Sequence, residues 1–286
     1  MSVPPIVQAL GVAILATAAI ALPLSGRGGR WRALPGWVAF WAFFAPLLVA
    51  LSRVSRHVSI PILGLVMFAA LREHFYLAPV RPQDRWAIWF AYGSIPLALY
   101  GASVANFGIF LAAVLLALFL ILPTLLAAGA QPGYLDAMGR ILLGMLVYVF
   151  CTGHLGFLVH APTGQLELFG VLVLGAEGPQ RLAGRPRQDQ PILQPLLGVV
   201  AGLVLACGLG AWVGPWAGLT VTRGAVAGAL VAASVLAGRM VTEAVTVDLT
   251  HAASASVVGR AAFLDRTMPA VYAAPLYYHY LHHLGP

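Results

Sequence analysis

Long apolar runs repeat along almost the whole chain, and they constrain its fold more than any other feature. A helix needs about 20 apolar residues to cross the roughly 30 Å hydrocarbon core of a bilayer. Full or partial runs of this kind can be drawn at residues 4–24, 34–52, 57–71, 86–101, 105–128, 140–160, 165–178, 191–213, 222–245 and 268–284. The sequence therefore predicts an all-α, polytopic integral membrane protein with about ten transmembrane helices.

Composition agrees with this prediction. Of the 286 residues, 60% are hydrophobic and only 9% are charged, which leaves too little polar surface to cover the core of a soluble domain. No linker or low-complexity segment interrupts the pattern, so we expect a single transmembrane domain over residues 1–286. Its cytoplasmic loops are expected near residues 25–33, 72–86, 129–140, 178–190 and 239–267.

The basic residues, all sixteen of which are arginines, indicate the orientation of the chain. Cytoplasmic loops of membrane proteins carry an excess of positive charge. Thirteen arginines fall in alternate loops, and only Arg53, Arg56 and Arg223 fall on the other side. The distribution predicts a multi-pass protein of a bacterial-type inner membrane with both termini outside. The net charge of +7 then reflects topology and attraction to anionic headgroups rather than binding to nucleic acid.

The last thirty residues, VVGRAAFLDRTMPAVYAAPLYYHYLHHLGP, resemble the C-terminal signature of the phosphatidate cytidylyltransferases, or CDP-diacylglycerol synthases. In that family the signature reads approximately PGHGGxLDRxDSLxxAxPxFxxxL. Its frame is kept at Gly259, Leu264, Asp265, Arg266, Ala270 and Pro275. The resemblance implies the fold of this family.

Three further segments are similar to elements of the same family, in the same order. Leu71-Arg72-Glu73 looks like the LRE or WEW element, and residues 179–185 (PQRLAGR) look like WGKLFGR. Residues 233–240 (ASVLAGRM) look like ASVLGDL. The resemblance therefore covers nearly the whole chain.

The groups that carry the chemistry of the family are replaced at four motifs. Transfer of a cytidylyl group from CTP to phosphatidic acid uses divalent metal held by carboxylates, with Lys or Arg on the phosphates. Residues 190–198 (QPILQPLLG) stand in place of SPxKTxEG, and Gly238-Arg239 puts a cation where GD has a carboxylate. The KRD turn becomes TVD, ending at Asp248, and GHGGxLDRxD becomes GRAAFLDRTM over residues 259–268. The chain also contains no lysine.

Two interpretations of the remaining charged residues stay open. In an active enzyme, Mg²⁺ and catalysis would depend on the carboxylates of Asp265, Asp248 and Glu243. Phosphate or a lipid headgroup would then be bound by Arg266, Arg260 and Arg239. In the other interpretation these acids and arginines pair with one another at the membrane surface and stabilise the fold, so that neither a metal site nor a catalytic residue is expected.

The sequence thus predicts a phosphatidate cytidylyltransferase-like membrane protein that has lost CTP-dependent turnover. We expect it to act without a cofactor, as a lipid-binding or structural subunit of a membrane assembly. Its expected partners are phospholipids and either another membrane protein or a second copy of the chain. The alternative is a divergent but active CDP-diacylglycerol synthase, or a related phospholipid-headgroup transferase, that uses Mg²⁺.

Overall fold

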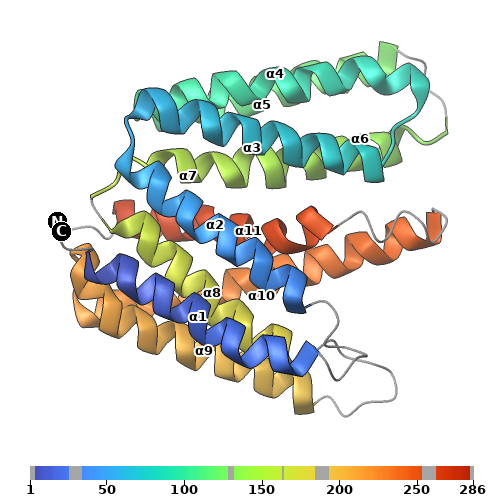
Figure 1. The fold of residues 1–286 in the computed structure, drawn as a ribbon. Coiled ribbons are helices and arrows are strands. Elements are labelled where there is room, and N and C mark those ends of the chain that lie inside the picture. The colour runs from blue at the N-terminus through green and yellow to red at the C-terminus, as the bar shows by residue number, and fades with distance from the viewer. Residues whose placement is uncertain are drawn as a thin grey trace. The chain divides into compact units, whose positions relative to one another are not determined.

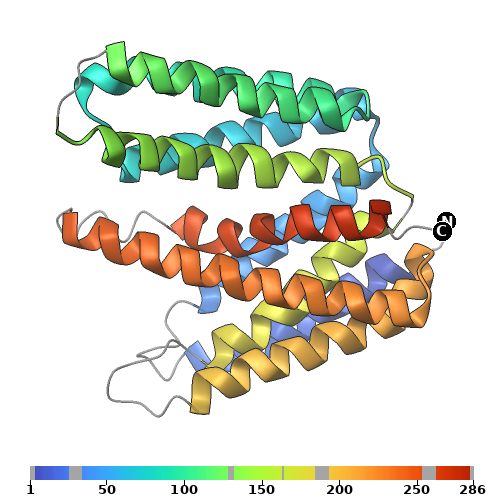
Figure 2. The ribbon, with the colours of Figure 1, turned by 180° about the vertical axis from the view of Figure 1, so that it is seen from behind.

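The computed structural model describes residues 4–25, 34–127, 132–162, 164–183, 193–252 and 262–283. Within these ranges the regular structure is entirely helical, and no strand occurs (Figures 1 and 2). The helices are α1 (Pro5–Ser25), α2 (Leu34–Arg53), α3 (Arg56–Leu77), α4 (Arg85–Ser103), α5 (Phe107–Ala127), α6 (Tyr134–Gly144), α7 (Thr152–Leu158), α8 (Gln165–Ala183), α9 (Leu193–Val213), α10 (Val221–Ala252) and α11 (Ala262–His283). A π-helical segment, Met145–Cys151, joins α6 to α7 without a break. The prediction of an all-helical chain is confirmed for the described residues.

Each predicted apolar run contains a helix, but several helices extend beyond their run into the predicted loops. α3 continues to Leu77, α8 to Ala183 and α10 to Ala252, so the predicted loop at 239–267 begins later than the first charged residue suggested. A helix satisfies its own backbone hydrogen bonds, and it can therefore leave the apolar region and continue with charged residues on its surface. Charge marks the end of an apolar run and not the end of a helix.

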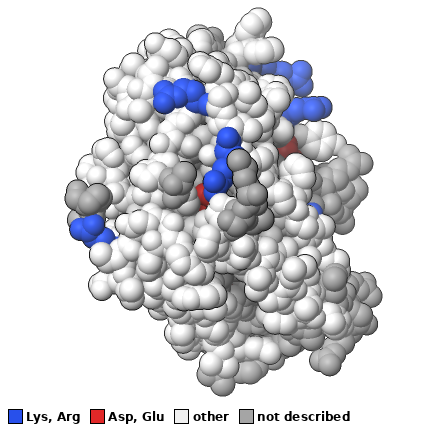
Figure 3. Space-filling view, turned by 60° about the vertical axis from the view of Figure 1, so that its left-hand side comes forward, with Lys and Arg blue, Asp and Glu red and all other residues white. Residues whose placement is uncertain are grey.

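In the part of the chain that the structure describes, six helical segments are long and apolar enough to cross a membrane: Leu34–Arg53, Arg56–Leu77, Phe107–Ala127, Tyr134–Leu158, Gln194–Ala217 and Val221–Asp248. Large apolar side chains on these segments are open to the surroundings, among them Phe43 (70% exposed), Leu65 (69%) and Phe119 (71%). The face drawn in Figure 3 is correspondingly almost free of charge, with a few arginines and fewer acids. These features are compatible with a multi-pass membrane protein.

Contacts between helices divide the chain into two compact units, which we describe separately. Unit 1 comprises residues 1–54, 160–239 and 273–286, and unit 2 comprises residues 55–159 and 240–272. The single transmembrane domain expected from the sequence stays a prediction.

In unit 1, α8 is the most deeply buried helix, because every residue from Leu166 to Gly178 is buried. It packs against α1, α2 and α9. Three aromatic residues of α2 contribute to this core. The ring of Trp41 packs against those of Phe40 and Phe44, with centroid distances of 5.9 and 5.7 Å. A helix covered on all sides in this way needs partners for any charged group that it carries.

In unit 2, α3, α4, α5 and the continuous α6–α7 helix pack together. Phe110 of α5 lies fully buried among the rings of Phe150, His154 and Phe157, with centroid distances of 5.8, 5.1 and 5.4 Å. The C-terminal end of α3 and the N-terminal end of the α6–α7 helix line a polar pocket.

Candidate functional site

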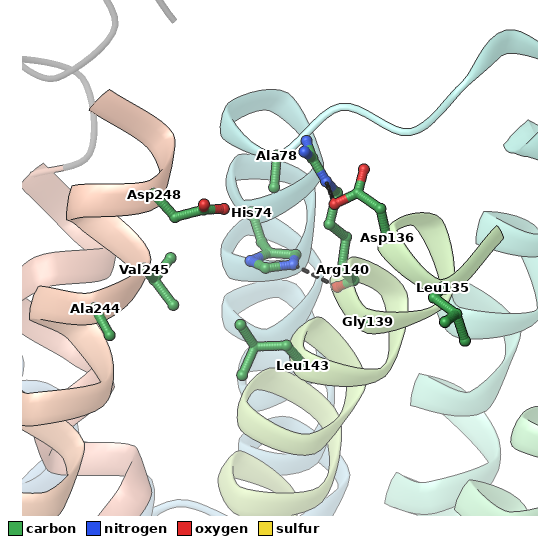
Figure 4. A pocket seen from close by; sticks show the side chains of 10 residues that line it. All are labelled: His74, Ala78, Leu135, Asp136, Gly139, Arg140, Leu143, Ala244, Val245 and Asp248. Carbon is green, nitrogen blue, oxygen red and sulfur yellow. Dashed lines mark hydrogen bonds and ion pairs between the residues drawn. The ribbon is translucent and has the colours of Figure 1, made fainter. Parts of the chain in front are cut away.

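A pocket of about 400 Å³ lies in unit 2 among α3, α6 and α10 (Figure 4). It is lined by His74, Ala78, Leu135, Asp136, Gly139, Arg140, Leu143, Ala244, Val245 and Asp248. Three of the six candidate membrane spans begin or end close to these residues. The pocket therefore lies at the level of the helix ends and combines an apolar wall with four titratable side chains.

His74 occupies the last turn of α3 and is only 1% exposed. Its Nε2 lies 2.8 Å from the carbonyl oxygen of Arg140. A carbonyl oxygen can only accept, so we assign the ring hydrogen to Nε2, and Nδ1 of the neutral imidazole is then an acceptor. In Figure 4 this second nitrogen lies on the side of Val245 and Asp248. The backbone of α6 thus sets both the orientation and the tautomer of His74.

Gly144 makes this approach of α3 to α6 possible. A Cβ at position 144 would lie 2.7 Å from Cδ2 of His74 and 3.1 Å from Cδ1 of Leu71. The missing side chain allows the imidazole to reach the carbonyl of Arg140 one turn earlier on α6.

Arg140 and Asp136 form the wall of the pocket on α6. Nε of Arg140 donates to Oδ1 of Asp136 at 3.0 Å, and Nη1 donates to the carbonyl oxygen of Pro79 at 3.1 Å. The guanidinium carries five N–H groups. Those beyond these two bonds have no partner among the described residues, and the side chain is 23% exposed. Arg140 can therefore still donate to an acceptor in the pocket.

Asp248 lines the pocket from α10, and among the predicted site residues whose side chains the structure describes it alone does so. Its carboxylate points toward His74 in Figure 4, and no hydrogen bond or ion pair joins it to the described residues. With His74 neutral, two carboxylates and one guanidinium leave the pocket with a net charge of −1. Its chemistry is that of an anionic site with one available cation on its wall.

Of the other acids predicted for catalysis, Glu243 is described by the structure, and it is not brought into this pocket. Glu243 precedes Asp248 by five residues, which places the two side chains about 140° apart around α10, and Glu243 does not line the pocket. The backbone of Asp265 belongs to α11, but its side chain lies outside what the structure describes, as does all of Arg260. Arg266 is half-buried on α11. Among the described residues, no group of three or more His, Cys, Asp or Glu side chains could hold a metal ion.

A second polar cluster lies in unit 1, near the end of α8. The carboxylate of Glu177 is completely buried and accepts hydrogen bonds from Nε1 of Trp41 at 3.2 Å and Nε of Arg181 at 2.8 Å. Nη1 of Arg239 donates to Oε1 of Gln180 at 3.3 Å. Arg239 and Gln180 come from residues 233–240 and 179–185, so these two segments meet here.

At the other end of α8, Glu167 is 1% exposed and its Oε1 accepts from Ser52 at 2.8 Å and from Arg53 at 3.1 Å. Both buried acids of α8 are thus held by cations. This is the behaviour expected of charges inside a helical membrane core.

Sequence reasoning missed most residues of both clusters. The spacing of Asp136 and Arg140, four residues apart, is a signal for a helical ion pair. His74 and Glu177 are polar residues at or inside apolar runs, and such residues are rare enough to be informative. Their partners could not be read from sequence spacing, since the carbonyl of Arg140 and the indole of Trp41 lie on other helices.

Comparisons with protein families, with curated proteins and with solved structures found no match to this chain.

Proposed function

We propose that the chain is a phosphatidate cytidylyltransferase-like membrane protein that has lost CTP-dependent turnover and acts as a lipid-binding or structural subunit of a membrane assembly. The observation that supports this best is the position of Arg239. Arg239 stands in the sequence where the resemblance expects a metal-binding carboxylate. Its guanidinium donates a hydrogen bond to Gln180 at 3.3 Å. A fixed cation there opposes the approach of Mg²⁺.

The proposal includes a multi-pass arrangement of about ten spans in a bacterial-type inner membrane, with both termini outside. Contacts within unit 2 support the charge distribution on which this rests. Arg81 donates to the carbonyl of Pro132 at 2.7 Å, and Arg140 donates to that of Pro79, so two predicted cytoplasmic loops lie together. Arg56, which the charge distribution assigns to the outer side, lies at the opposite end of α3. It donates to the carbonyl of Ser103, the last residue of α4.

Lipid binding is assigned to the arginines at the proposed cytoplasmic surface, Arg239 and Arg266 among the described residues and Arg260 beyond them. A test is the binding of purified protein to vesicles of phosphatidylcholine that contain phosphatidic acid. Arg239→Gln is expected to weaken binding by about threefold to tenfold, since one contact between a cation and the phosphate is lost. Equal binding to vesicles with and without phosphatidic acid would contradict this assignment.

The subunit role predicts a stable partner. We expect purification from native membranes in mild detergent to retain a second protein or a second copy at fixed stoichiometry. Recovery of a monomer without any stoichiometric partner contradicts the subunit role and leaves lipid binding as the function.

The competing function is a divergent, active nucleotidyl or phospholipid-headgroup transferase. One observation favours it, namely that the carboxylate of Asp248 faces a pocket without a partner among the described residues. Activity of this kind would require Asp248, Glu243 and Asp265 to share Mg²⁺. The substitution Asp248→Asn would then abolish a metal-dependent turnover that the wild-type protein carries out.

A further inference from the structure

The pocket of unit 2 contains two acceptors that lack a donor. Nδ1 of His74 is an acceptor because the carbonyl of Arg140 fixes the hydrogen on Nε2. The carboxylate of Asp248 points toward the same imidazole and has no partner among the described residues (Figure 4). A buried acceptor on His74 and an exposed, unpaired carboxylate on Asp248 face one space, and both can accept hydrogen bonds from a ligand that carries positive charge and N–H groups.

The wall on α6 has the opposite character. Arg140 keeps N–H groups beyond those that contact Asp136 and Pro79, and these can donate to a phosphate oxygen. The pocket therefore has acceptors on the side of α10 and α3 and available donors on the side of α6. A zwitterion with an ammonium and a phosphate group would satisfy both sides.

The position and the remaining lining indicate a lipid. The spans Arg56–Leu77, Tyr134–Leu158 and Val221–Asp248 each begin or end near the pocket, which places it at headgroup depth. Leu135, Leu143 and Val245 supply apolar surface beside the charged groups. A volume of about 400 Å³ is at the small end of ligand sites and suits a headgroup with the first part of its glycerol ester.

We propose that this pocket binds the headgroup of an amine phospholipid, whose primary ammonium donates to Asp248 and Nδ1 of His74 and whose phosphate accepts from Arg140. The inference rests on the proposed lipid-binding function and names the lipid class of a site in unit 2 that includes none of Arg239, Arg266 and Arg260. The decisive feature of the ligand is the N–H donor. A quaternary ammonium of the same charge cannot satisfy the two acceptors.

The test compares short-chain phosphatidylethanolamine with short-chain phosphatidylcholine, which have the same net charge and differ in their N–H donors. Binding to the purified full-length chain in detergent is measured by native mass spectrometry and by titration. The wild-type protein is expected to bind phosphatidylethanolamine about tenfold more tightly, because charge-assisted hydrogen bonds are made only by the primary amine. Asp248→Asn should remove this preference.

Val247→Thr is the matched control, because it changes the neighbouring residue on α10 and leaves the pocket lining intact. It should keep the preference for phosphatidylethanolamine. Ala244→Leu is the second test variant, since it retains every charge and fills part of the cavity. It should weaken binding of phosphatidylethanolamine about tenfold, as expected when a well-fitting site is overpacked.

Equal affinities of the wild-type protein for the two lipids overturn the proposal, and so does a preference that survives both Asp248→Asn and Ala244→Leu. Binding to phosphatidic acid vesicles and CTP turnover are measured on the same preparation. If these behave as proposed while the amine preference is absent, only the assignment of this pocket fails. If phosphatidic acid binding is absent while the amine preference is present, the Arg239 assignment fails instead.

Discussion

Two buried polar side chains, those of His74 and Glu177, depend on partners from another helix. Nε2 of His74 contacts the backbone of α6, and the carboxylate of Glu177 contacts the indole of Trp41 on α2. Each partner removes a desolvation cost that the polar group would otherwise impose on the fold. Substitutions that separate such a pair are therefore expected to destabilise the protein more than substitutions at exposed charges.

Gly144→Ala tests the contact between α3 and α6. The added Cβ would lie 2.7 Å from Cδ2 of His74, so the imidazole or the helix has to move. We expect a loss of about 1–3 kcal/mol, the usual cost of overpacking, measured as a lowered Tm in detergent. Gly139→Ala, on the same helix, is the control, because nothing lies within 4 Å of the added Cβ. It should leave the Tm unchanged or slightly raised. Equal Tm values for the two variants would show that the contact does not constrain the fold.

Glu177→Gln tests the buried ion pair with Arg181. Because the carboxylate is completely buried, its neutralisation weakens the charge-assisted hydrogen bonds that it accepts from Arg181 and Trp41, and we expect a loss of about 3 kcal/mol. Asp136→Asn also breaks an Arg–carboxylate pair at i, i+4, but its carboxylate is 62% exposed. The expected loss there is within about 0.5 kcal/mol. Denaturant or thermal unfolding of the two variants should separate them clearly, and similar losses would contradict the assigned burial.

At the level of the helices, packing of α9 against α10 relies on the absence of side chains. A Cβ at Gly224 would come within 2.0 Å of the carbonyl oxygen of Gly210, so the two backbones could not keep their present separation. Gly224→Ala is expected to lower stability by about 3 kcal/mol or to prevent folding. Gly208→Ala on α9, where nothing lies within 4 Å of the added Cβ, should be tolerated. Retained stability in both variants would argue against this close approach.

The positions of the helices could be predicted from the sequence because the apolar runs are long and each contains a helix. Their ends could not, since α10 continues to Ala252 past Arg239 and Glu243. The same limit applies to the candidate site. Asp248 was identified by its place in a motif, whereas His74 was not, because its role depends on Gly144 and on a backbone carbonyl of another helix. Contacts of this kind leave no periodic signal in a sequence.

At the level of the whole molecule, the six candidate spans among the described residues and the nearly uncharged face drawn in Figure 3 are compatible with a multi-pass membrane protein. The arginine distribution further predicts that both termini lie outside. Fusion of a reporter after Pro286 that is active only outside the cytoplasm should yield activity, and fusion within the loop at 78–84 should not. The reverse pattern would invert the orientation and place the arginines of the α3–α4 and α5–α6 loops on the outer side.

We propose that the chain keeps the frame of the cytidylyltransferase family without CTP-dependent turnover. The most direct test supplies the purified protein with CTP, Mg²⁺ and phosphatidic acid and measures CDP-diacylglycerol by mass spectrometry, beside an active cytidylyltransferase as positive control. We predict no product above a reaction that lacks protein. Robust product that disappears when Mg²⁺ is chelated, and that is lost in Asp248→Asn, would contradict the account and establish an active enzyme.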